Sequence, residues 1–470
     1  MMRAVKTIGV ASTMAATLLL SGCVLAPTGT KEEQIRLTEA GRPFEQPLEK
    51  RNLPQLPSEA TWQDVLHRAF LANGDLEAAY FEWKAAVARI DMAATWPNTN
   101  LALGFEYMFS RERMKAWNRT TLSAQPDPAM SLSLPTKVAQ SGKVAFESAR
   151  AAGYRFAAAK FDLQRKVLEG YLDLALMEER VRIQQANVSL LKLLFDTASN
   201  RVQAGGPQQD MLKAQIEYRL AENELANMQA EANSMRAMLN GMLSRPADAL
   251  LRLPATLPAP RPLAANDARL IALAVDLNPE LASLARQVAG RKDALALARM
   301  AYIPDINPMG AITGDVSKSV GAMIMLPTSI PMIRGQIREA DAMLRSAEAM
   351  ARQAGSDRAA SFVATLYALR NAERQTAILE QRILPAAEQM LASSRQAYST
   401  GTVGFVDLID SQRTLLEVRR MIAEAKISRE KRLAELEALA GADAETLGQP
   451  TTAPAMPPTT HSATQPSSRA

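Results

Sequence analysis

The sequence predicts a mainly α-helical chain that also carries a small membrane β-structure. Three observations support this prediction. The 470 residues are only 5% aromatic, and apolar residues recur at helical spacing along most of the chain, which suits long helices packed on one another. Two shorter segments alternate with the period of a strand instead. The same order of helix and strand signals then occurs a second time, about 205 positions later, so the chain is built from two repeats.

The N-terminus has the features of a secretion signal. Arg3 and Lys6 precede an apolar stretch that ends in Leu-Ser-Gly followed by Cys23, the only cysteine. A charged start, an apolar segment and small residues before a cleavage site are typical of a signal peptide, which we expect at 1–22. The motif resembles the bacterial lipobox, which implies a lipid on Cys23 as the mature N-terminus. Lipoproteins that are retained at the inner membrane usually have Asp directly after the cysteine. This chain has Val24 there, and in this it resembles lipoproteins that are sorted to the outer membrane.

Composition divides the mature chain into five parts. We expect a polar, proline-studded and extended arm at 23–57, a first repeat at 58–252, a proline-rich linker at 253–264, a second repeat at 265–442 and a disordered tail at 443–470. Each repeat is predicted to contain a helix, a β-hairpin, a long helix and a further helix. In the second repeat the long helix contains Pro385, which should kink or split it. Arg429 and Arg432 interrupt the apolar stripe of the last helix.

The first β-hairpin is predicted at about 98–135. Apolar residues alternate with small or polar ones from Thr99 to Phe109, enough for one tilted membrane strand. We expect a polar loop from Arg111 to Pro128 and a short return strand from Met130 to Leu134. The second hairpin, at about 305–327, is less regular because its first strand contains proline and glycine.

Four strands cannot close a membrane barrel, which needs about eight or more. An open sheet would leave unpaired backbone groups in lipid. We therefore expect the strands of several copies of the chain to form one shared barrel. The residues themselves do not set the number of copies.

Two glycine-rich turns between long helices share a layout. The stretch YSTGTVGFVDLID starts at Tyr398 and contains Asp407 and Asp410, which lie three apart and so on one face of a helix. The stretch RVQAGGPQQD ends at Asp210 in the same way. Taken alone, these carboxylates are favourable charges at the positive end of a helix.

These turns, together with the Asn-Pro-Glu-Leu stretch at 278–281, resemble the TolC family of trimeric outer-membrane exit ducts of bacterial efflux and type I secretion systems. The residues that match the family's V-D-x-[LI]-D stretch are Val406, Asp407, Ile409 and Asp410. The resemblance covers about 58–441. It implies three chains, a shared 12-stranded β-barrel and an α-helical coiled-coil tunnel that extends into the periplasm.

The resemblance also implies a gate at the periplasmic end of the tunnel. Its residues would be Asp407, Asp410, Asp210 and Tyr398. In the best-known closed ducts, an arginine two residues after the glycine of Y-x-x-G joins the tyrosine to an aspartate of the other repeat. Val403 stands at that position here, so the resemblance does not extend to the charged latch, whereas the ring of aspartates is kept.

The implied function is the outer-membrane channel of a tripartite efflux pump, a passive duct for drugs or metal ions from the periplasm of a Gram-negative bacterium to the outside. The implied partners are two further copies of the chain, a periplasmic adaptor (membrane fusion) protein, an inner-membrane pump of the resistance-nodulation-division type and outer-membrane lipids. Two alternatives are a type I secretion exit duct and a periplasmic adaptor or tether lipoprotein that does not span the membrane. The two hairpins disfavour the second.

Other functions have little support in the sequence. The chain has two histidines, of which His461 lies in the tail and His67 on a helix, so we do not expect an enzyme. The net charge of +5 includes two charges of the signal segment, and no basic and aromatic patch indicates nucleic-acid binding. We expect no cofactor apart from the lipid on Cys23, and no metal site. The methionines of the predicted strands are Met108, Met130, Met309, Met323 and Met325. Thioethers can bind Cu(I), but gap-filling in apolar packing is the favoured interpretation.

Overall fold

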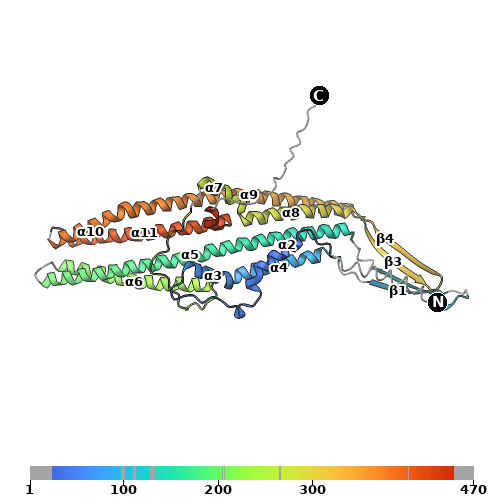
Figure 1. The fold of residues 1–470 in the computed structure, drawn as a ribbon, viewed down its shortest axis with the longest axis horizontal. Coiled ribbons are helices and arrows are strands. Elements are labelled where there is room, and N and C mark those ends of the chain that lie inside the picture. The colour runs from blue at the N-terminus through green and yellow to red at the C-terminus, as the bar shows by residue number, and fades with distance from the viewer. Residues whose placement is uncertain are drawn as a thin grey trace, which may run out of the picture.

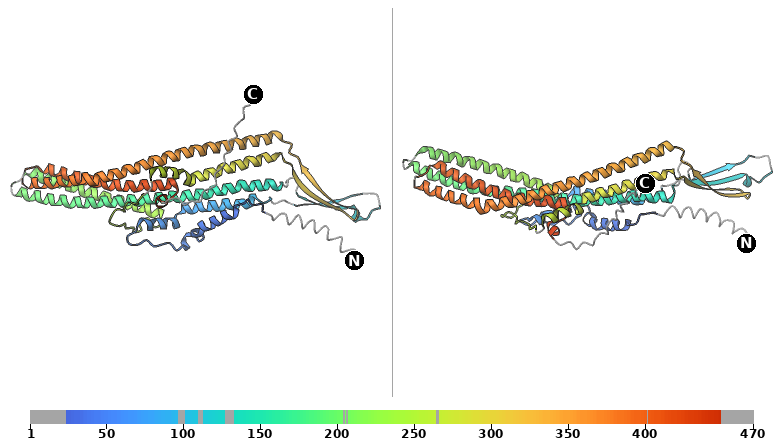
Figure 2. Two further views of the ribbon diagram at one scale, coloured as in Figure 1. Left: turned by 45° about the horizontal axis from the view of Figure 1, so that its top comes forward. Right: turned by 90° about the horizontal axis from the view of Figure 1, so that it is seen from above.

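The computed structural model describes residues 24–96, 101–109, 113–126, 133–203, 205, 207–263, 266–400 and 402–448. The signal segment, Cys23 and most of the tail lie outside these residues. Long helices run side by side along the longest axis, and the strands extend from one end of them (Figures 1 and 2). None of the described helices combines the length and the apolar character that crossing a bilayer would require.

The two repeats fold alike. The first contains α3 (Trp62–Ala72), α4 (Gly74–Ala93), β1 (Leu101–Tyr107), β2 (Thr120–Pro126), α5 (Pro135–Gln203) and α6 (Gln208–Met242). The second contains α7 (Asp267–Leu277), α8 (Pro279–Arg299), β3 (Asp305–Thr313), β4 (Ser317–Met325), α9 (Ile330–Ile378), α10 (Leu384–Ser399) and α11 (Phe405–Ala440). Single turns of 3-10 helix occur at Arg42–Phe44, Leu48–Lys50, Ala116–Arg119 and Met300–Tyr302. The predicted order of elements is therefore present twice.

An asparagine marks the same point in each repeat. The side chain of Asn73 accepts hydrogen bonds from the first turn of α4, and its amide donates to the backbone oxygen of Met242 at the end of α6. Asn278 does the same in the second repeat: it accepts from the first turn of α8, and its amide donates to the backbone oxygen of Leu439 near the end of α11. Capping oxygens of this kind satisfy the free N–H groups of a helix start. The repeat therefore extends to individual hydrogen bonds.

The N-terminal arm is not extended, as the sequence suggested, but folded. Residues Thr30–Gly41 form α2, which lies against α4 (Figure 1). Glu33 is 3% exposed and accepts a hydrogen bond of 2.9 Å from the indole nitrogen of Trp83. The backbone N–H of Leu25 donates to the backbone oxygen of Ala94 at 2.8 Å. The described part of the arm therefore begins at the end of the helices from which the strands extend and runs back along α4.

The four strands form one antiparallel sheet in the order β1-β2-β3-β4. The second hairpin lies close to its prediction. In the first hairpin, β2 occupies Thr120–Pro126, which the sequence assigned to a loop, and this loop prediction is wrong. Residues 130–132 of the expected return strand lie outside the described residues, and 133–134 are not in a strand. Strand β2 pairs with β3, with Leu122 opposite Ile312. The two hairpins are therefore joined into one sheet.

Pro385 interrupts the second long helix as predicted. Helix α9 ends at Ile378, and a turn of π-helix at Leu379–Ile383 leads into α10. A proline has no N–H for the carbonyl four residues earlier, and its ring clashes with that carbonyl. The wider π turn absorbs this conflict. Helix α5, which has no internal proline, runs for 69 residues without a break.

Charged residues on the apolar stripe of α11 are accounted for by ion pairs. Arg429 is 9% exposed and pairs with Glu373 of α9 and with its neighbour Glu430. Arg261 of the linker joins Glu430 at 3.1 Å and Glu437 at 2.8 Å. Buried pairs of this kind fix the position of their elements more than they add stability. The linker is thereby held against α11.

The predicted tail begins with ordered structure. Ala444–Gly448 form the short helix α12, and Ala442 and Ala444 pack in a core cluster with residues of α7, α9 and α11. The backbone N–H of Ala444 donates to Glu437 at 2.9 Å. The expectation of disorder from 443 onward is therefore wrong for its first residues, while 449–470 lie outside the described residues.

Candidate functional site

The sheet has one apolar and one polar face. Residues opposite each other in antiparallel strands share a face, and successive residues alternate between faces. The register therefore places on one face Leu103, Phe105, Leu122, Ile306, Val320 and Ile324. Val320 is 82% exposed and Leu103 is 72% exposed. Exposed aliphatic side chains over a whole sheet face indicate contact with lipid.

The opposite face is polar over most of its length. It carries Glu106, Thr121, Ser123, Gln125, Asn307, Thr313 and Ser319. Thr121 and Thr313 also share a hydrogen bond of 3.0 Å between their hydroxyls. A sheet with lipid on one side and water on the other has this composition.

Aromatic residues lie at both ends of the sheet. Tyr107 and Phe109 at the distal end have ring centroids 5.0 Å apart, and the adjacent Trp117 is 48% exposed. At the end near the helices, the Trp96 indole donates to the backbone oxygen of Ser133 at 2.8 Å, and Tyr302 is 43% exposed. Aromatic belts of this kind mark the two interfaces of a bilayer.

The other end of the molecule is formed by the two turns. Tyr398, at the end of α10, is buried, and its ring lies 5.9 Å from the ring of Phe405. Arg201, at the end of α5, stacks its guanidinium 4.4 Å from the centroid of the Tyr398 ring and donates to the Tyr398 backbone oxygen at 3.2 Å. An arginine of the first repeat therefore joins the two turns. Sequence reasoning missed it, although cations are favoured at helix C-termini.

The gate residues predicted from the sequence have different surroundings. Asp407 accepts a hydrogen bond of 3.1 Å from the backbone N–H of Gly404 and so caps α11. The side chain of Asp410 is 64% exposed, with its carboxylate 3.8 Å from the Arg413 guanidinium. Asp210 lies in the first turn of α6. Among the described residues, the Tyr398 hydroxyl has no hydrogen-bond partner, so it is not bonded to Asp210.

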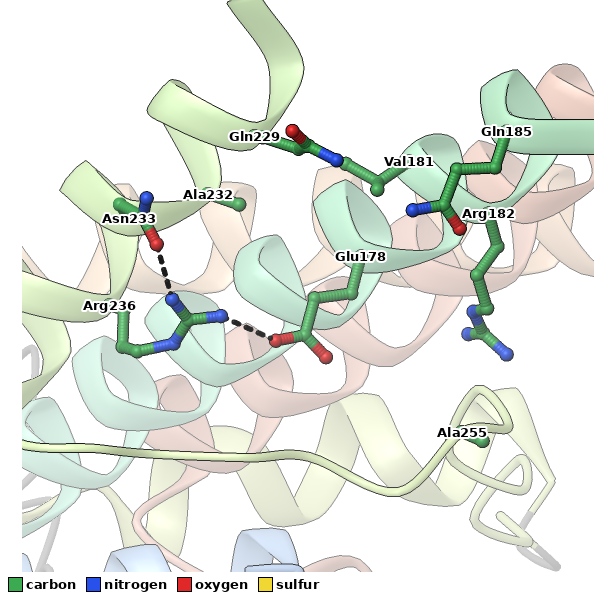
Figure 3. A pocket seen from close by; sticks show the side chains of 9 residues that line it. All are labelled: Glu178, Val181, Arg182, Gln185, Gln229, Ala232, Asn233, Arg236 and Ala255. Carbon is green, nitrogen blue, oxygen red and sulfur yellow. Dashed lines mark hydrogen bonds and ion pairs between the residues drawn. The ribbon is translucent and has the colours of Figure 1, made fainter. Parts of the chain in front are cut away.

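Two hollows lie along the helices. The larger, of about 500 Å³, lies between α5 and α6 and beside Ala255 of the linker (Figure 3). Across it Arg236 of α6 donates to Glu178 of α5 at 3.1 Å, and on its own helix it donates to Asn233 at 2.6 Å. The smaller, of about 210 Å³, lies between α5, α6 and α11 and is lined in part by Gln412. Within the described residues, no group of three or more His, Cys, Asp or Glu could hold a metal ion.

Comparison with known proteins agrees with this geometry. No protein-family model matches the chain. The cobalt-zinc-cadmium resistance protein CzcC of Cupriavidus metallidurans is 24% identical over 384 residues, which cover 78% of this chain and 87% of that protein. The outer-membrane protein VceC of Vibrio cholerae superposes with a TM-score of 0.68 at 16% identity, over 81% of this chain and 96% of its own. The outer-membrane channel OprN gives 0.67 at 18% identity, over 82% and 90%.

The long helices and the four-stranded antiparallel sheet are the fold of these two outer-membrane proteins. The likeness in sequence to CzcC and in fold to VceC and OprN agrees with the resemblance to the TolC family that the two turns carry. The fold class predicted for the chain, mainly α-helical with four antiparallel strands, is thereby confirmed.

Proposed function

We propose that this channel is the exit duct of a tripartite pump that exports metal cations. The observation that supports a duct is the sheet with one apolar and one polar face. Its edge strands are β1 and β4, which need partners from other copies of the chain because unpaired edges are costly in lipid. Three copies would join four strands each into a 12-stranded barrel whose polar faces line a pore. The likeness to a cobalt-zinc-cadmium resistance protein supports the cargo.

Bilayer recordings of the purified full-length protein test this function. Native mass spectrometry should find a trimer, and the same preparation should give stable pores in planar membranes. Stable monomers with no conductance would contradict the proposal. For the cargo, cells that lack the protein should accumulate metal cations and regain export when it is restored, whereas unchanged metal content with lost drug export would assign a different cargo.

The N-terminus supports a lipid anchor. Leu25 is hydrogen-bonded to Ala94, at the end of the helices from which the strands extend. A lipid on Cys23 would therefore lie at the same level as the inner edge of the sheet, next to the membrane. Mass spectrometry of the purified protein should find Cys23 as an acylated N-terminus, and an unprocessed Met1 would contradict this.

The gate is proposed at the turns, with Asp410 as its main charge. Asp407 already caps α11, whereas Asp410 is exposed on the same face. A trimer would bring three such pairs together, and a ring of like charges attracts cations. The variant Asp407→Ala/Asp410→Ala should lose cation selectivity and block by divalent cations while it keeps the trimer. Wild-type selectivity in that trimer would overturn the assignment.

We propose a periplasmic adaptor that contacts the helical end and a pump of the resistance-nodulation-division type in the inner membrane. Crosslinking in intact cells from the helices around the turns should capture an adaptor, and capture only from the strand end would contradict this arrangement.

A further inference from the structure

Three methionines stand together on the polar face of the sheet. The pairing of β3 with β4 sets Met309 opposite Gly321, Met323 opposite Asn307 and Met325 opposite Asp305, so all three share one face. Their exposed fractions are 38%, 39% and 37%. They are the exception on a face that otherwise carries mainly hydroxyl, amide and carboxylate side chains.

Packing does not account for this placement. Apart from these three methionines, the large apolar side chains of the four described strands lie on the opposite, apolar face. In these strands that face carries leucine, isoleucine, valine and phenylalanine but no methionine. If methionine only filled gaps in apolar packing, it would occur on that side as well. Methionine and the aliphatic residues are instead separated by face. The sulfur atoms are on the side where the sheet meets water.

The geometry lets the three thioethers converge. Met309 and Met323 are diagonal neighbours across the strand pair, and Met323 and Met325 are two apart on one strand, so adjacent Cβ atoms are about 7 Å apart. Methionine side chains are long and flexible enough to bridge such a gap. The Met309 side chain lies over Gly321 of the neighbouring strand, with its sulfur 3.8 Å from the point where a Cβ of that residue would be.

We propose that Met309, Met323 and Met325 form a thioether site for the soft monovalent cations Cu(I) and Ag(I). This rests on the proposed function, because only in an assembled barrel does the polar face line the pore. Thioethers are soft ligands that suit Cu(I), whereas Zn²⁺ and Co²⁺ take imidazole, thiolate or carboxylate ligands. Asp305 beside the site is ion-paired with Lys137 at 2.8 Å. The three thioethers are neutral, and the charge of Asp305 is already balanced by Lys137. The site therefore favours a monovalent cation over a divalent one.

Silver(I) titration of the purified full-length trimer tests the site. Silver nitrate in chloride-free buffer is the probe, isothermal calorimetry measures the affinity, and X-ray absorption at the silver edge reports sulfur neighbours. The variant Met309→Leu/Met323→Leu/Met325→Leu keeps volume and apolar character. It should weaken silver binding at least about tenfold and lose the sulfur signal. Titration with Zn²⁺ should not distinguish it from wild type.

Three exposed methionines of α9 provide the matched control. The variant Met332→Leu/Met343→Leu/Met350→Leu removes the same number of exposed sulfur atoms, since these residues are 59%, 46% and 63% exposed. It should bind silver like wild type. Cys23 is unchanged in both variants, so its sulfur cancels from the comparison.

Equal silver binding by the strand variant and wild type would overturn the site, as would an equal loss in the α9 variant. Conductance measured on the same preparations separates this result from the proposed function. A strand variant that forms pores but has lost silver binding supports both, and pores with unchanged silver binding reject the site alone. Absence of pores in wild type rejects the function. Met323→Leu alone, at the centre of the three, should weaken binding if the triple variant does not assemble.

Discussion

The turn between α5 and α6 and the turn between α10 and α11 carry the same kinds of residues, yet their aspartates have different roles. In the second turn, Asp407 caps the new helix through the backbone N–H of Gly404. In the first, Pro207 is the N-cap residue of α6, and no side-chain hydrogen bond from the described residues caps that helix. Gly205 makes the bend with a φ of 89°, a conformation that favours glycine. A shared sequence layout therefore does not imply a shared use of the carboxylate.

The arginines of the two turns differ in the same way. The second turn has Val403 at the position where the family pattern has an arginine, and the first supplies Arg201 instead. Its guanidinium covers the Tyr398 ring from the other repeat. Arg201 thus joins the two turns by stacking and by one backbone hydrogen bond, whereas the Tyr398 hydroxyl takes no part.

Of the substitutions that test the difference between the two turns, removal of the Arg201 side chain should have the largest effect on the stability of the second turn. Arg201→Ala removes a cation–π contact and a charged hydrogen bond, together worth about 2 kcal/mol. The second turn should then open more often, although the substitution lies in the first repeat. Amide hydrogen exchange at Thr400 and Thr402, whose N–H groups bond within the turn, should become about 30-fold faster.

Arg219→Ala is the control for this prediction. Arg219 lies 5.5 Å from the Tyr218 ring but is 70% exposed and on the same helix as that ring. Its loss should leave exchange at Thr400 and Thr402 unchanged. If Arg201→Ala also left them unchanged, the two turns would be held together by something other than this arginine.

The next largest effect should come from Asp407→Ala. Loss of a capping carboxylate costs about 1 kcal/mol, so the Gly404 amide should exchange about fivefold faster. Asp210→Ala removes no cap and only a charge near a helix start, worth about 0.3 kcal/mol. Amides in the first turn of α6 should change less than twofold. Equal effects of the two substitutions would show that the turns are equivalent after all.

Local sequence patterns predicted those features of the fold that depend on residues close together in the chain. Alternation located β1 and β4, and Pro385 located the break between α9 and α10. The strand β2 was missed because Thr121, Ser123 and Gln125 make it as polar as a loop, and only pairing with its neighbours shows it as a strand.

Features that depend on tertiary contacts could not be read in this way. Helix α2 buries Glu33 and Leu37 against other helices, and a short polar segment gives no sign of that. Arg429 interrupts an apolar stripe, and its partner Glu373 lies 56 residues away. Arg201 meets Tyr398 across 197 residues. For the gate, the sequence named the aspartates but not which of them is engaged in a cap.

Asp410→Asn should also have only a small effect on stability, and this makes it the sharpest test of the gate. The carboxylate is exposed and its 3.8 Å contact with Arg413 is long, and exposed pairs of this kind contribute about 0–1 kcal/mol. Arg413 also keeps its 2.6 Å pair with Glu217 of α6. Exchange around the second turn should therefore stay within about twofold of wild type.

The same substitution removes one negative charge from each chain at the helical end, without removing a cap. If Asp410 is the main charge of a ring in the trimer, cation selectivity should fall in bilayer recordings while the turn remains intact. Asp407→Ala should show the opposite pattern, with a weakened turn and a smaller change in selectivity. Selectivity that followed Asp407 and not Asp410 would mean that the capping carboxylate, not the exposed one, faces the pore.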